Sequence, residues 1–272
     1  MNNKTNYILI GLLVLGAFLV GSLWTRVRYL EQGKQEVKET KTPQVTVGAA
    51  QPTRPPFNPS KTEKPTVKFF VMSFCPYGNQ AEAGLQPVYD LLKDKVNWQP
   101  QYIIYKDYCN QAPEDQKADC EKNSCLKKDS QTYCSMHGLG ELNQDVREIC
   151  AFNMGQSAKW WDFVSRVNDK CSAKDVDTCW EAQAKEAGLD TLTIKSCQES
   201  QAFSLMDKEI AQMEKYQAQG SPMVFVNDQL YDGGRAPEDY KKGICGAFNK
   251  EPTECAKALG AASANTAGGC GQ

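Results

Sequence analysis

The residues most able to do chemistry in this sequence are cysteines, and Cys75 stands where two predicted elements meet. A run of strand-forming residues, 67–72, leads to Cys75, and Pro76 follows it as the first residue of a predicted helix. At a helix N-terminus, free N–H groups and the helix dipole lower a cysteine pKa from about 8.5 to about 3.5–7.5. Because the thiolate is the attacking species in disulfide exchange, we predict a reactive thiol at Cys75. The alternative is a cysteine buried as a small apolar side chain.

The position three residues after Cys75 is Gly78, where a two-cysteine redox motif would carry its second thiol. A mixed disulfide on Cys75 must then be released by a partner, a small thiol or another cysteine of the chain. Cys270 is the candidate, because it has glycine on both sides and follows Cys255 by fifteen residues, a stretch that spans roughly 20–23 Å. We predict that Cys270 is the resolving thiol, in the same molecule or in a neighbouring one; an incidental tail cysteine is the alternative.

The other ten cysteines are enough for five disulfides, which would leave Cys75 and Cys270 unpaired. A bond between Cys245 and Cys255 would contribute roughly 2–3 kcal/mol. A zinc site is the alternative for the first group, although its gaps of ten, four and eight residues lack the close pairs typical of structural zinc. We therefore expect disulfides, with no metal and no cofactor. The groups are Cys109, Cys120, Cys125 and Cys134, then Cys150, Cys171, Cys179 and Cys197, and finally Cys245 and Cys255.

The composition favours an oxidising compartment and gives no sign of nucleic-acid binding. Twelve cysteines accompany a single histidine among 272 residues, and cytosolic thiols would keep such a set reduced. The net charge of −2 shows no excess of basic residues that could bind the phosphates of a nucleic acid. Residues 7–24 carry no charge, a length about sufficient to cross a bilayer, with a cleaved signal peptide as the alternative. We expect a single-pass membrane protein whose globular part lies on the extracytoplasmic side.

The pattern of the chain predicts four parts. Residues 1–30 form the signal anchor, 31–65 a disordered proline-rich linker, 66–256 the globular domain, and 257–272 a flexible tail. Within the domain, strands are predicted at 67–72, 97–105 and 221–228, and a helix with a 3.6-residue period follows the first strand. A cysteine-rich loop, 107–140, and several helices make an insertion over about 107–216, before a last helix at 236–248. This order predicts a mixed α/β sheet with helices on its faces.

Several stretches carry a family resemblance: "FCPYG" after a strand, "REICAFNMGQSAKWWDFVSRVNDKC", "GSPMVFVN" and "ICGAFNKEPTEC". Over about residues 66–256 the chain resembles the thioredoxin fold in its DsbA-like form, in which a helical domain is inserted. The same region is similar to the thioredoxin-like segment of vacuolar sorting receptors and to the interferon-inducible lysosomal thiol reductases. The resemblance implies a thioredoxin-like sheet with a cysteine-rich helical insertion.

The resemblance also implies roles for particular residues. Cys75 corresponds to the nucleophilic thiol, with Pro76 and Tyr77 in the positions that tune its pKa. Pro222 corresponds to the cis-proline loop that lies beside that thiol and pairs with a bound peptide, so we expect Ser221–Pro222 to be cis and to contact Cys75. Gly78 departs from the family pattern, which puts a dithiol cycle within the motif in doubt.

We therefore predict single-cysteine thiol–disulfide exchange on cysteine-containing proteins or peptides, served by an unidentified redox partner. The alternative is a redox-inactive module that binds peptides in the same groove. His137 is expected to be an ordinary loop residue, and Trp160 and Trp161 are expected to pack in the core.

Overall fold

The computed structural model describes residues 56–260 and Cys270. The predicted signal anchor and most of the predicted linker lie outside these residues. Within the described part, no helix combines the length and the apolar character needed to cross a membrane. The end of the predicted linker belongs to the domain, because Thr62 pairs with Phe248 and the Phe57 ring packs edge-on against Tyr231 at 5.1 Å.

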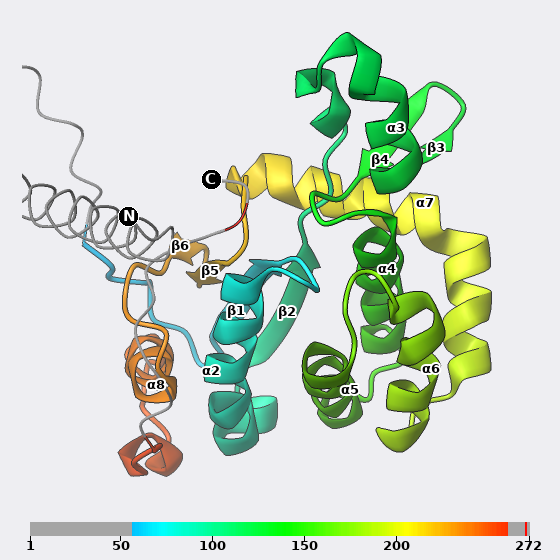
Figure 1. Cartoon of the computed structure of the whole chain (residues 1–272). Coiled ribbons are helices and arrows are strands. Elements are labelled where there is room, and N and C mark those ends of the chain that lie inside the picture. Colours follow the sequence, from blue (N-terminus) through cyan, green and yellow to red (C-terminus); the bar gives the residue numbers. More distant parts are fainter. Residues whose placement is uncertain (1–55, 261–269, 271–272) are drawn as a thin grey trace, which may run out of the picture. The chain divides into compact units, whose positions relative to one another are not determined.

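The central sheet has four strands in the order β2-β1-β5-β6 (Figure 1). β1 (Thr66–Val71) runs parallel to β2 (Asn97–Tyr102) and antiparallel to β5 (Met223–Val226). β6 (Gln229–Leu230) closes a tight hairpin with β5. The predicted mixed sheet is confirmed. β1 is almost wholly buried because it lies in the middle of the sheet, between β2 and β5.

Two helices flank this sheet. α2 (Pro76–Leu92) is the crossover between the parallel strands β1 and β2, and the 3-10 turn η1 (Lys93–Lys95) follows it. α8 (Pro237–Cys245) packs beside α2, and η3 (Thr253–Ala256) ends the domain. The two helices approach closely at Gly84, where a Cβ atom would lie 2.9 Å from the Tyr240 ring of α8 and would overlap the Arg235 carbonyl oxygen just before that helix. A larger residue at position 84 would push the helices apart.

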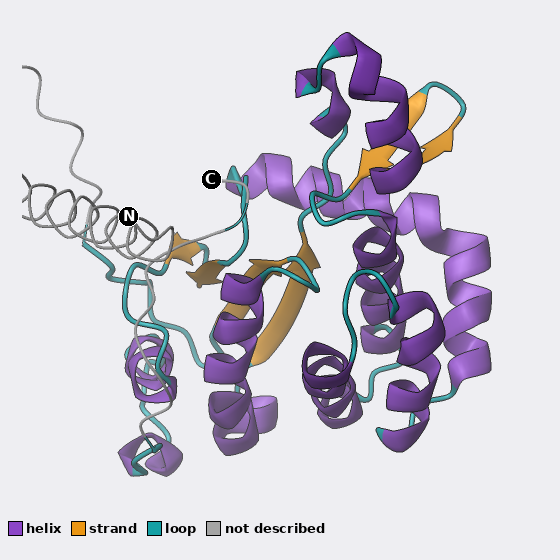
Figure 2. Cartoon of the chain, viewed as in Figure 1, coloured by secondary structure: helices purple, strands orange, loops and turns teal. Residues whose placement is uncertain are grey.

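The chain between β2 and β5 forms the predicted helical insertion (Figure 2). It contains four helices that pack on one another: α4 (Leu139–Phe152), α5 (Ser157–Lys170), α6 (Val176–Glu186) and the long α7 (Thr191–Tyr216). Before them comes a segment that we call the flap, residues 107–135. It holds η2 (Tyr108–Gln111), α3 (Glu114–Ser124) and the hairpin of β3 (Cys125–Lys128) with β4 (Gln131–Cys134).

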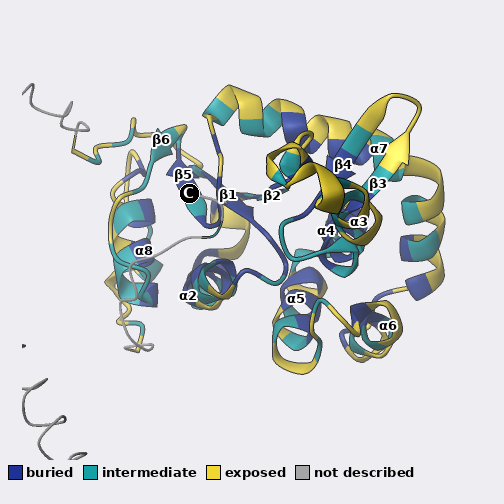
Figure 3. Cartoon of the chain, turned by 45° about the horizontal axis from the view of Figure 1, so that its top comes forward, coloured by how far each residue is buried: buried dark blue, intermediate teal, exposed yellow. Residues whose placement is uncertain are grey.

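The prediction that 107–140 is a loop is wrong, because it contains a helix and a hairpin. The helix went undetected because its residues have no hydrophobic periodicity: α3 buries none of its side chains. Figure 3 shows its exposed surface. The disulfides Cys109–Cys120 and Cys125–Cys134 cross-link this segment internally. Backbone hydrogen bonds between Tyr105 and Cys134, and the Tyr133 hydroxyl bond to Asp207, attach it to the domain.

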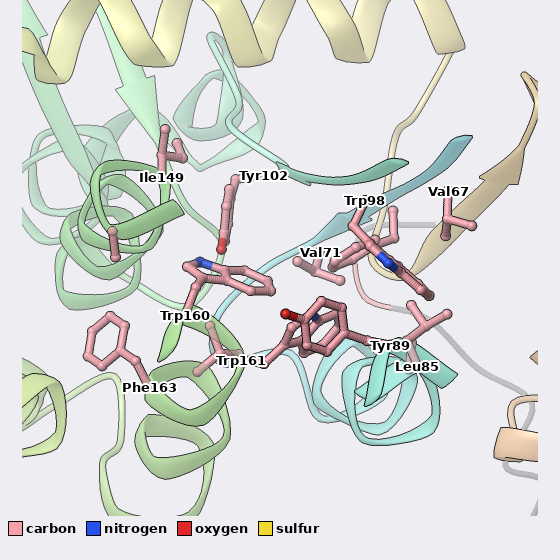
Figure 4. Packing of buried hydrophobic residues seen from close by; sticks show 14 of the residues in the cluster. Val67, Val71, Leu85, Tyr89, Trp98, Tyr102, Ile149, Trp160, Trp161 and Phe163 are labelled. Atoms are coloured by element: carbon pink, nitrogen blue, oxygen red, sulfur yellow. The ribbon is translucent and has the colours of Figure 1, made fainter. Parts of the chain in front are cut away.

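The insertion and the sheet share one hydrophobic core (Figure 4). Trp161 stacks on Phe69 of β1 with ring centroids 5.6 Å apart, and Trp160 meets Trp161 edge-on at 4.9 Å. Both indoles are buried, and the Trp160 Nε1 donates a hydrogen bond to the Glu148 carbonyl oxygen at 3.0 Å. The predicted packing role of both tryptophans is confirmed.

All twelve cysteines fall within the described residues, and each is disulfide-bonded. The expected five bonds within the three groups are confirmed. The expectation that Cys75 and Cys270 are unpaired is wrong, because they are bonded to each other. Counting cysteines along the chain cannot detect a bond that spans 195 residues. The other pairs are Cys109–Cys120, Cys125–Cys134, Cys150–Cys197, Cys171–Cys179 and Cys245–Cys255.

Removing the longest cross-link within the insertion should cost more stability than removing the shortest. Cys150–Cys197 joins residues 47 apart, and Cys171–Cys179 joins residues 8 apart. The entropic effect of a cross-link on the unfolded chain grows with loop length. We therefore expect Cys150→Ala/Cys197→Ala to lower the free energy of unfolding by about 4 kcal/mol and Cys171→Ala/Cys179→Ala by about 2.5 kcal/mol. Denaturant titration followed by circular dichroism measures both, and equal losses would contradict the chain-entropy explanation.

Candidate functional site

Cys75 occupies the position that its sequence predicts. It is the N-cap residue of α2, and Pro76 is the first helical residue. The Cys75 N–H donates to the Met72 carbonyl oxygen at 3.0 Å, which closes the turn between β1 and α2. The Cys75 carbonyl oxygen accepts the Asn79 N–H at 2.9 Å, so α2 begins directly at the cysteine. The side chain therefore lies at the positive end of a helix, where a thiolate is stabilised once the disulfide opens.

Cys270 meets Cys75 at the loop before β5. Its N–H donates to the Ser221 carbonyl oxygen at 2.8 Å, and its own carbonyl oxygen accepts the Ser221 N–H at 2.9 Å. These two bonds make an antiparallel bridge. Ser221–Pro222 is cis, as predicted, and the Cys75 Sγ lies 3.5 Å from the Ser221 carbonyl oxygen. The predicted thiol, the predicted resolving cysteine and the cis-proline loop therefore meet at one place.

Gly78 lies in the same site, where the space for a side chain is already filled. A Cβ at position 78 would lie 2.5 Å from the Ser221 Oγ, 3.3 Å from the Met72 carbonyl oxygen and 3.5 Å from the Cys75 Cβ. The Ser221 Oγ is held there because it accepts the Met72 N–H at 3.1 Å. Glycine is therefore required by the packing of the loop, and no second thiol fits at this position without movement of Ser221.

A small apolar cluster surrounds the Cys75–Cys270 bond. Its buried members are Phe70, Met72, Cys75, Ile103, Ala218 and Phe225, and Tyr77 and Tyr105 pack against it. The Arg235 guanidinium lies over the Tyr77 ring at 5.8 Å, and the Tyr105 hydroxyl donates to the Gln219 carbonyl oxygen at 3.0 Å. Burial raises the pKa of Tyr105 to about 12, so this hydroxyl stays protonated. The influence of Pro76 and Tyr77 on the Cys75 pKa stays a prediction.

Two carboxylates of α4 that sequence reasoning missed support the loop before Cys75. The Phe74 N–H donates to the Glu141 Oε1 at 2.8 Å, and the Ser73 N–H donates to the Asp145 Oδ1 at 3.0 Å. The Ser73 hydroxyl also donates to the Asp145 Oδ1, at 2.6 Å. Both carboxylates are fully buried, and burial with the nearby Glu141 raises the pKa of Asp145 well above its usual range. The one available signal was their spacing of four residues, which puts both on one face of a helix.

His137 contacts the same carboxylate that holds Phe74. Its Nδ1 lies 2.9 Å from both oxygens of Glu141, and its backbone N–H donates to the Glu141 Oε2 at 3.3 Å. The hydrogen bond with Glu141 raises the pKa of His137 although partial burial opposes it. The single histidine is thus connected through Glu141 to the backbone of Phe74, the residue before Cys75. The glycine-containing loop around His137 did not indicate this connection.

Residues 89–245 match the family described as the vacuolar sorting receptor thioredoxin-like domain. The chain belongs to this family. The match begins within α2 and ends at Cys245, so it includes the insertion but neither Cys75 nor Cys270. Vacuolar-sorting receptor 5 of Arabidopsis thaliana is 22% identical over 170 residues, which are 50% of this chain and 28% of the receptor. The chain therefore spans less than a third of that receptor's length.

Solved structures show a likeness of fold to thioredoxin-like oxidoreductases. The reduced disulfide bond oxidoreductase DsbG of Mycobacterium tuberculosis has a TM-score of 0.47 at 14% identity, over 73% of this chain and 88% of that one. Oxidised BdbD of Bacillus subtilis has a TM-score of 0.44 at 16% identity, over 68% of this chain and 89% of that one. With TM-scores below 0.5, these two likenesses carry no argument about this chain. The matched family itself is described as a thioredoxin-like domain, and the chain has a mixed four-stranded sheet with a helical insertion between β2 and β5.

The contact between Gly78 and Ser221 can be measured with a double-mutant cycle. Gly78→Ala should lower the free energy of unfolding by about 1–3 kcal/mol, because the new methyl group overlaps the Ser221 Oγ. Ser221→Ala removes that oxygen. The loss of unfolding free energy in the double variant should therefore be smaller than the sum of the two single losses by at least about 0.5 kcal/mol. Denaturant titration of the four proteins gives the coupling.

Gly246→Ala is the matched control for this cycle. Gly246 has helical φ and ψ, and its Cβ would make an ordinary contact of 3.4 Å with the Lys242 carbonyl oxygen. Its effect should stay within about 0.5 kcal/mol. Additive losses for positions 78 and 221 would show that the oxygen is not what excludes a side chain at 78.

The ion pair between His137 and Glu141 should be visible in a proton titration. Because Glu141 raises the pKa of His137, the pair stabilises the fold fully below the unfolded pKa of histidine, and this contribution is lost as the pH rises through the folded value. NMR titration of this one imidazole should give a folded pKa above about 6.5. Glu141→Gln should lower it, whereas Glu214→Gln, on the exposed Lys106 ion pair, should leave it unchanged. An unchanged value in Glu141→Gln would contradict the assignment.

Proposed function

We propose that this chain is a thiol–disulfide exchange protein whose redox pair is Cys75 and Cys270. The observation that carries the proposal is the bond between them, formed while Cys270 is paired with Ser221 through two backbone hydrogen bonds. The thioredoxin-like fold of the family supports the same chemistry. Cys75 has the helix N-terminus that an attacking thiolate needs, and Cys270 supplies the thiol that Gly78 cannot.

In the reduced protein, the Cys75 thiolate attacks one sulfur of a substrate disulfide. A bond forms between Cys75 and that sulfur, and the other substrate sulfur leaves as a thiolate. Cys270 then loses its proton and attacks the Cys75 sulfur, so that the Cys75–substrate bond breaks and the Cys75–Cys270 bond forms. The two electrons that reduce the substrate disulfide come from these two thiols. An external dithiol, the unidentified redox partner, must return the pair to its reduced state.

The burial of the two sulfurs indicates where that external thiol attacks. Cys75 has no exposed surface in the disulfide form, whereas Cys270 is partly exposed. An incoming thiolate therefore reaches the bond at Cys270, and Cys75 leaves as a thiolate at the N-terminus of α2. A leaving thiol of low pKa departs faster, so the stabilisation of Cys75 favours this direction of attack.

The substrate class follows from the pairing at Ser221. The N–H and C=O groups of Ser221 hold Cys270 as an extended segment, and an extended peptide with its own cysteine can take the same two hydrogen bonds. The tail and the substrate then compete for one position. We accordingly propose cysteine-containing proteins or peptides in extended form as substrates, and we place the domain on the extracytoplasmic side of a membrane, anchored by residues 1–30.

A redox-inactive module that binds peptides at Ser221 is the second candidate. The family match supports this binding role, because the family is described from vacuolar sorting receptors. The matched residues, 89–245, include the insertion but neither Cys75 nor Cys270. In this case the Cys75–Cys270 bond would be structural and would not turn over.

The release of a peptide from Cys75 distinguishes the two candidates. After mild reduction, the full-length protein is mixed with a fluorescent cysteine peptide activated as its thionitrobenzoate disulfide, and the peptide is transferred to Cys75. The parent should release the peptide without added thiol. Cys270→Ser should hold it until a small thiol reaches roughly millimolar concentration, the effective concentration of a group tethered by a short linker.

Two variants control this experiment. Ser263→Ala changes the tail but keeps the Cys270 thiol, and it should release the peptide at the parent rate. Cys75→Ser lacks the thiol at the helix N-terminus, so peptide accepted at Cys270 should not be released without added thiol. Equal release from the parent and from Cys270→Ser would reject the redox pair. A parent whose Cys75–Cys270 bond resists mild reduction while the other five bonds open would favour the redox-inactive module.

A further inference from the structure

The flap contains a second group of sulfur atoms, independent of the Cys75 site. The bonds Cys109–Cys120 and Cys125–Cys134 lie side by side, with the Cys109 and Cys125 sulfurs 3.6 Å apart. The sulfurs of Cys109, Cys125 and Cys134 all lie within 4.8 Å of one another, and these three residues are at most 7% exposed. Cys120 adds a fourth sulfur through its bond to Cys109.

The buried side chains of the flap are three of these cysteines together with Tyr133 and Ser135, and of these only Tyr133 belongs to the main hydrophobic core. α3 contributes no buried side chain, and the apolar cluster of this segment consists of Cys109, Cys125 and Cys134, with Tyr108 and Cys120 packed against them. Such a small unit needs cross-links or a bound metal to stay folded. When the two disulfides are reduced, three buried thiols and the partly buried Cys120 thiol replace two covalent cross-links, and the other member of this cluster, Tyr108, supplies no cross-link in their place.

The arrangement of the sulfurs fits a metal better than a transfer of disulfides within the cluster. For Cys109 to attack Cys125 in line, its sulfur would have to lie roughly 5.6 Å from the Cys134 sulfur, given the 3.6 Å contact and an ordinary S–S bond. The observed group is more compact, within 4.8 Å. In a tetrahedral zinc site with Zn–S bonds of about 2.3 Å, neighbouring sulfurs are roughly 3.8 Å apart. The 3.6 Å contact is already close to one edge of that tetrahedron.

We propose that the reduced flap binds one zinc ion through Cys109, Cys120, Cys125 and Cys134. Sequence spacing argued against zinc because the gaps lack close pairs, but the β3–β4 hairpin places Cys125 directly opposite Cys134, which supplies such a pair in space. Four thiolates fill the coordination of zinc and leave no open position, so the site is structural. The flap then has two folded states, one closed by disulfides and one closed by metal.

The conversion between the states balances in electrons and protons. A thiol reductant delivers two electrons and two protons to each disulfide, which gives four thiols and the oxidised form of the reductant. Zinc binding then releases up to four protons, because the metal takes the thiolate form. Oxidation of the four thiolates by a disulfide oxidant expels the ion and restores the two bonds.

Alkylation of the reduced full-length chain tests the site without any substitution. The protein is reduced anaerobically with a phosphine, given one equivalent of Zn²⁺, and treated with iodoacetamide, after which peptides are mapped by mass spectrometry. Zinc should slow the modification of the four flap cysteines roughly ten-fold or more, and Cys171 and Cys179 should react at the rate seen without zinc. Addition of a chelator should remove the protection. Equal rates at all cysteines, or protection centred on another group, would overturn the proposal.

Cobalt spectra of two matched variants give a second measurement. Cys125→Ser/Cys134→Ser and Cys171→Ser/Cys179→Ser remove disulfides of nearly equal separation, 9 and 8 residues. With one equivalent of Co²⁺, the reduced parent and the second variant should show the strong visible bands of tetrahedral thiolate coordination, and Zn²⁺ should displace them. The first variant should lose these bands. Bands that persist in the first variant would place the metal elsewhere and reject the flap site.

Discussion

The close contact between Gly78 and Ser221 is the constraint on which the active loop depends. The Ser221 Oγ fills the place of a side chain at position 78, and it is fixed there by the Met72 N–H. The backbone N–H and C=O groups of Ser221 are hydrogen-bonded to the backbone of Cys270. The Ser221 side chain therefore fills the space that a second motif cysteine would need, and the Ser221 backbone binds Cys270. Ser221 thus contacts both places where this site differs from a dithiol motif, Gly78 through its side chain and Cys270 through its backbone.

The helical insertion is part of the site because α4 holds the loop that carries Cys75. Glu141 and Asp145 accept the backbone N–H groups of Phe74 and Ser73, so both of these donors in the loop are paired. Buried carboxylates are costly unless hydrogen-bonded or protonated, and burial raises the pKa of nearby Glu148 to about 7. The Tyr102 hydroxyl donates to Glu148 at 2.9 Å and so ties β2 to the same helix. The sheet and the insertion are thus coupled by polar contacts as well as by the tryptophan core.

The sequence was informative where the signal is local and failed where partners are distant. Cys75 at a helix start follows from a strand, a cysteine and a proline in succession. Of the helices in the insertion, α4, α5 and α7 follow from their apolar period, whereas α6 was not predicted. The cis bond at Pro222 came from family resemblance, since no local pattern specifies it. Glu141 and Asp145 look like ordinary polar residues of a helix until the fold brings Ser73 and Phe74 to them. α3 was missed because cross-links replace the buried face that would have revealed it. Cys270 was predicted as the resolving thiol of Cys75, but a bond between the two was not expected, because 195 residues separate them and no local pattern marks the pair.

In the exchange mechanism that we propose, the resolving thiol lies on the tail, so the tail and the substrate compete for one position. In a dithiol motif the second sulfur lies behind the first, so it does not occupy the groove that receives the peptide. Here the backbone of Cys270 takes both hydrogen bonds of Ser221, so a substrate must displace the tail before it can pair there. In this proposal Cys270 competes at an effective concentration in the millimolar range, because it follows Cys255 by fifteen residues. A substrate that binds Ser221 weakly is soon replaced by Cys270 and released. One that binds more tightly than the tail keeps its mixed disulfide, so the strength of two backbone hydrogen bonds decides between exchange and retention.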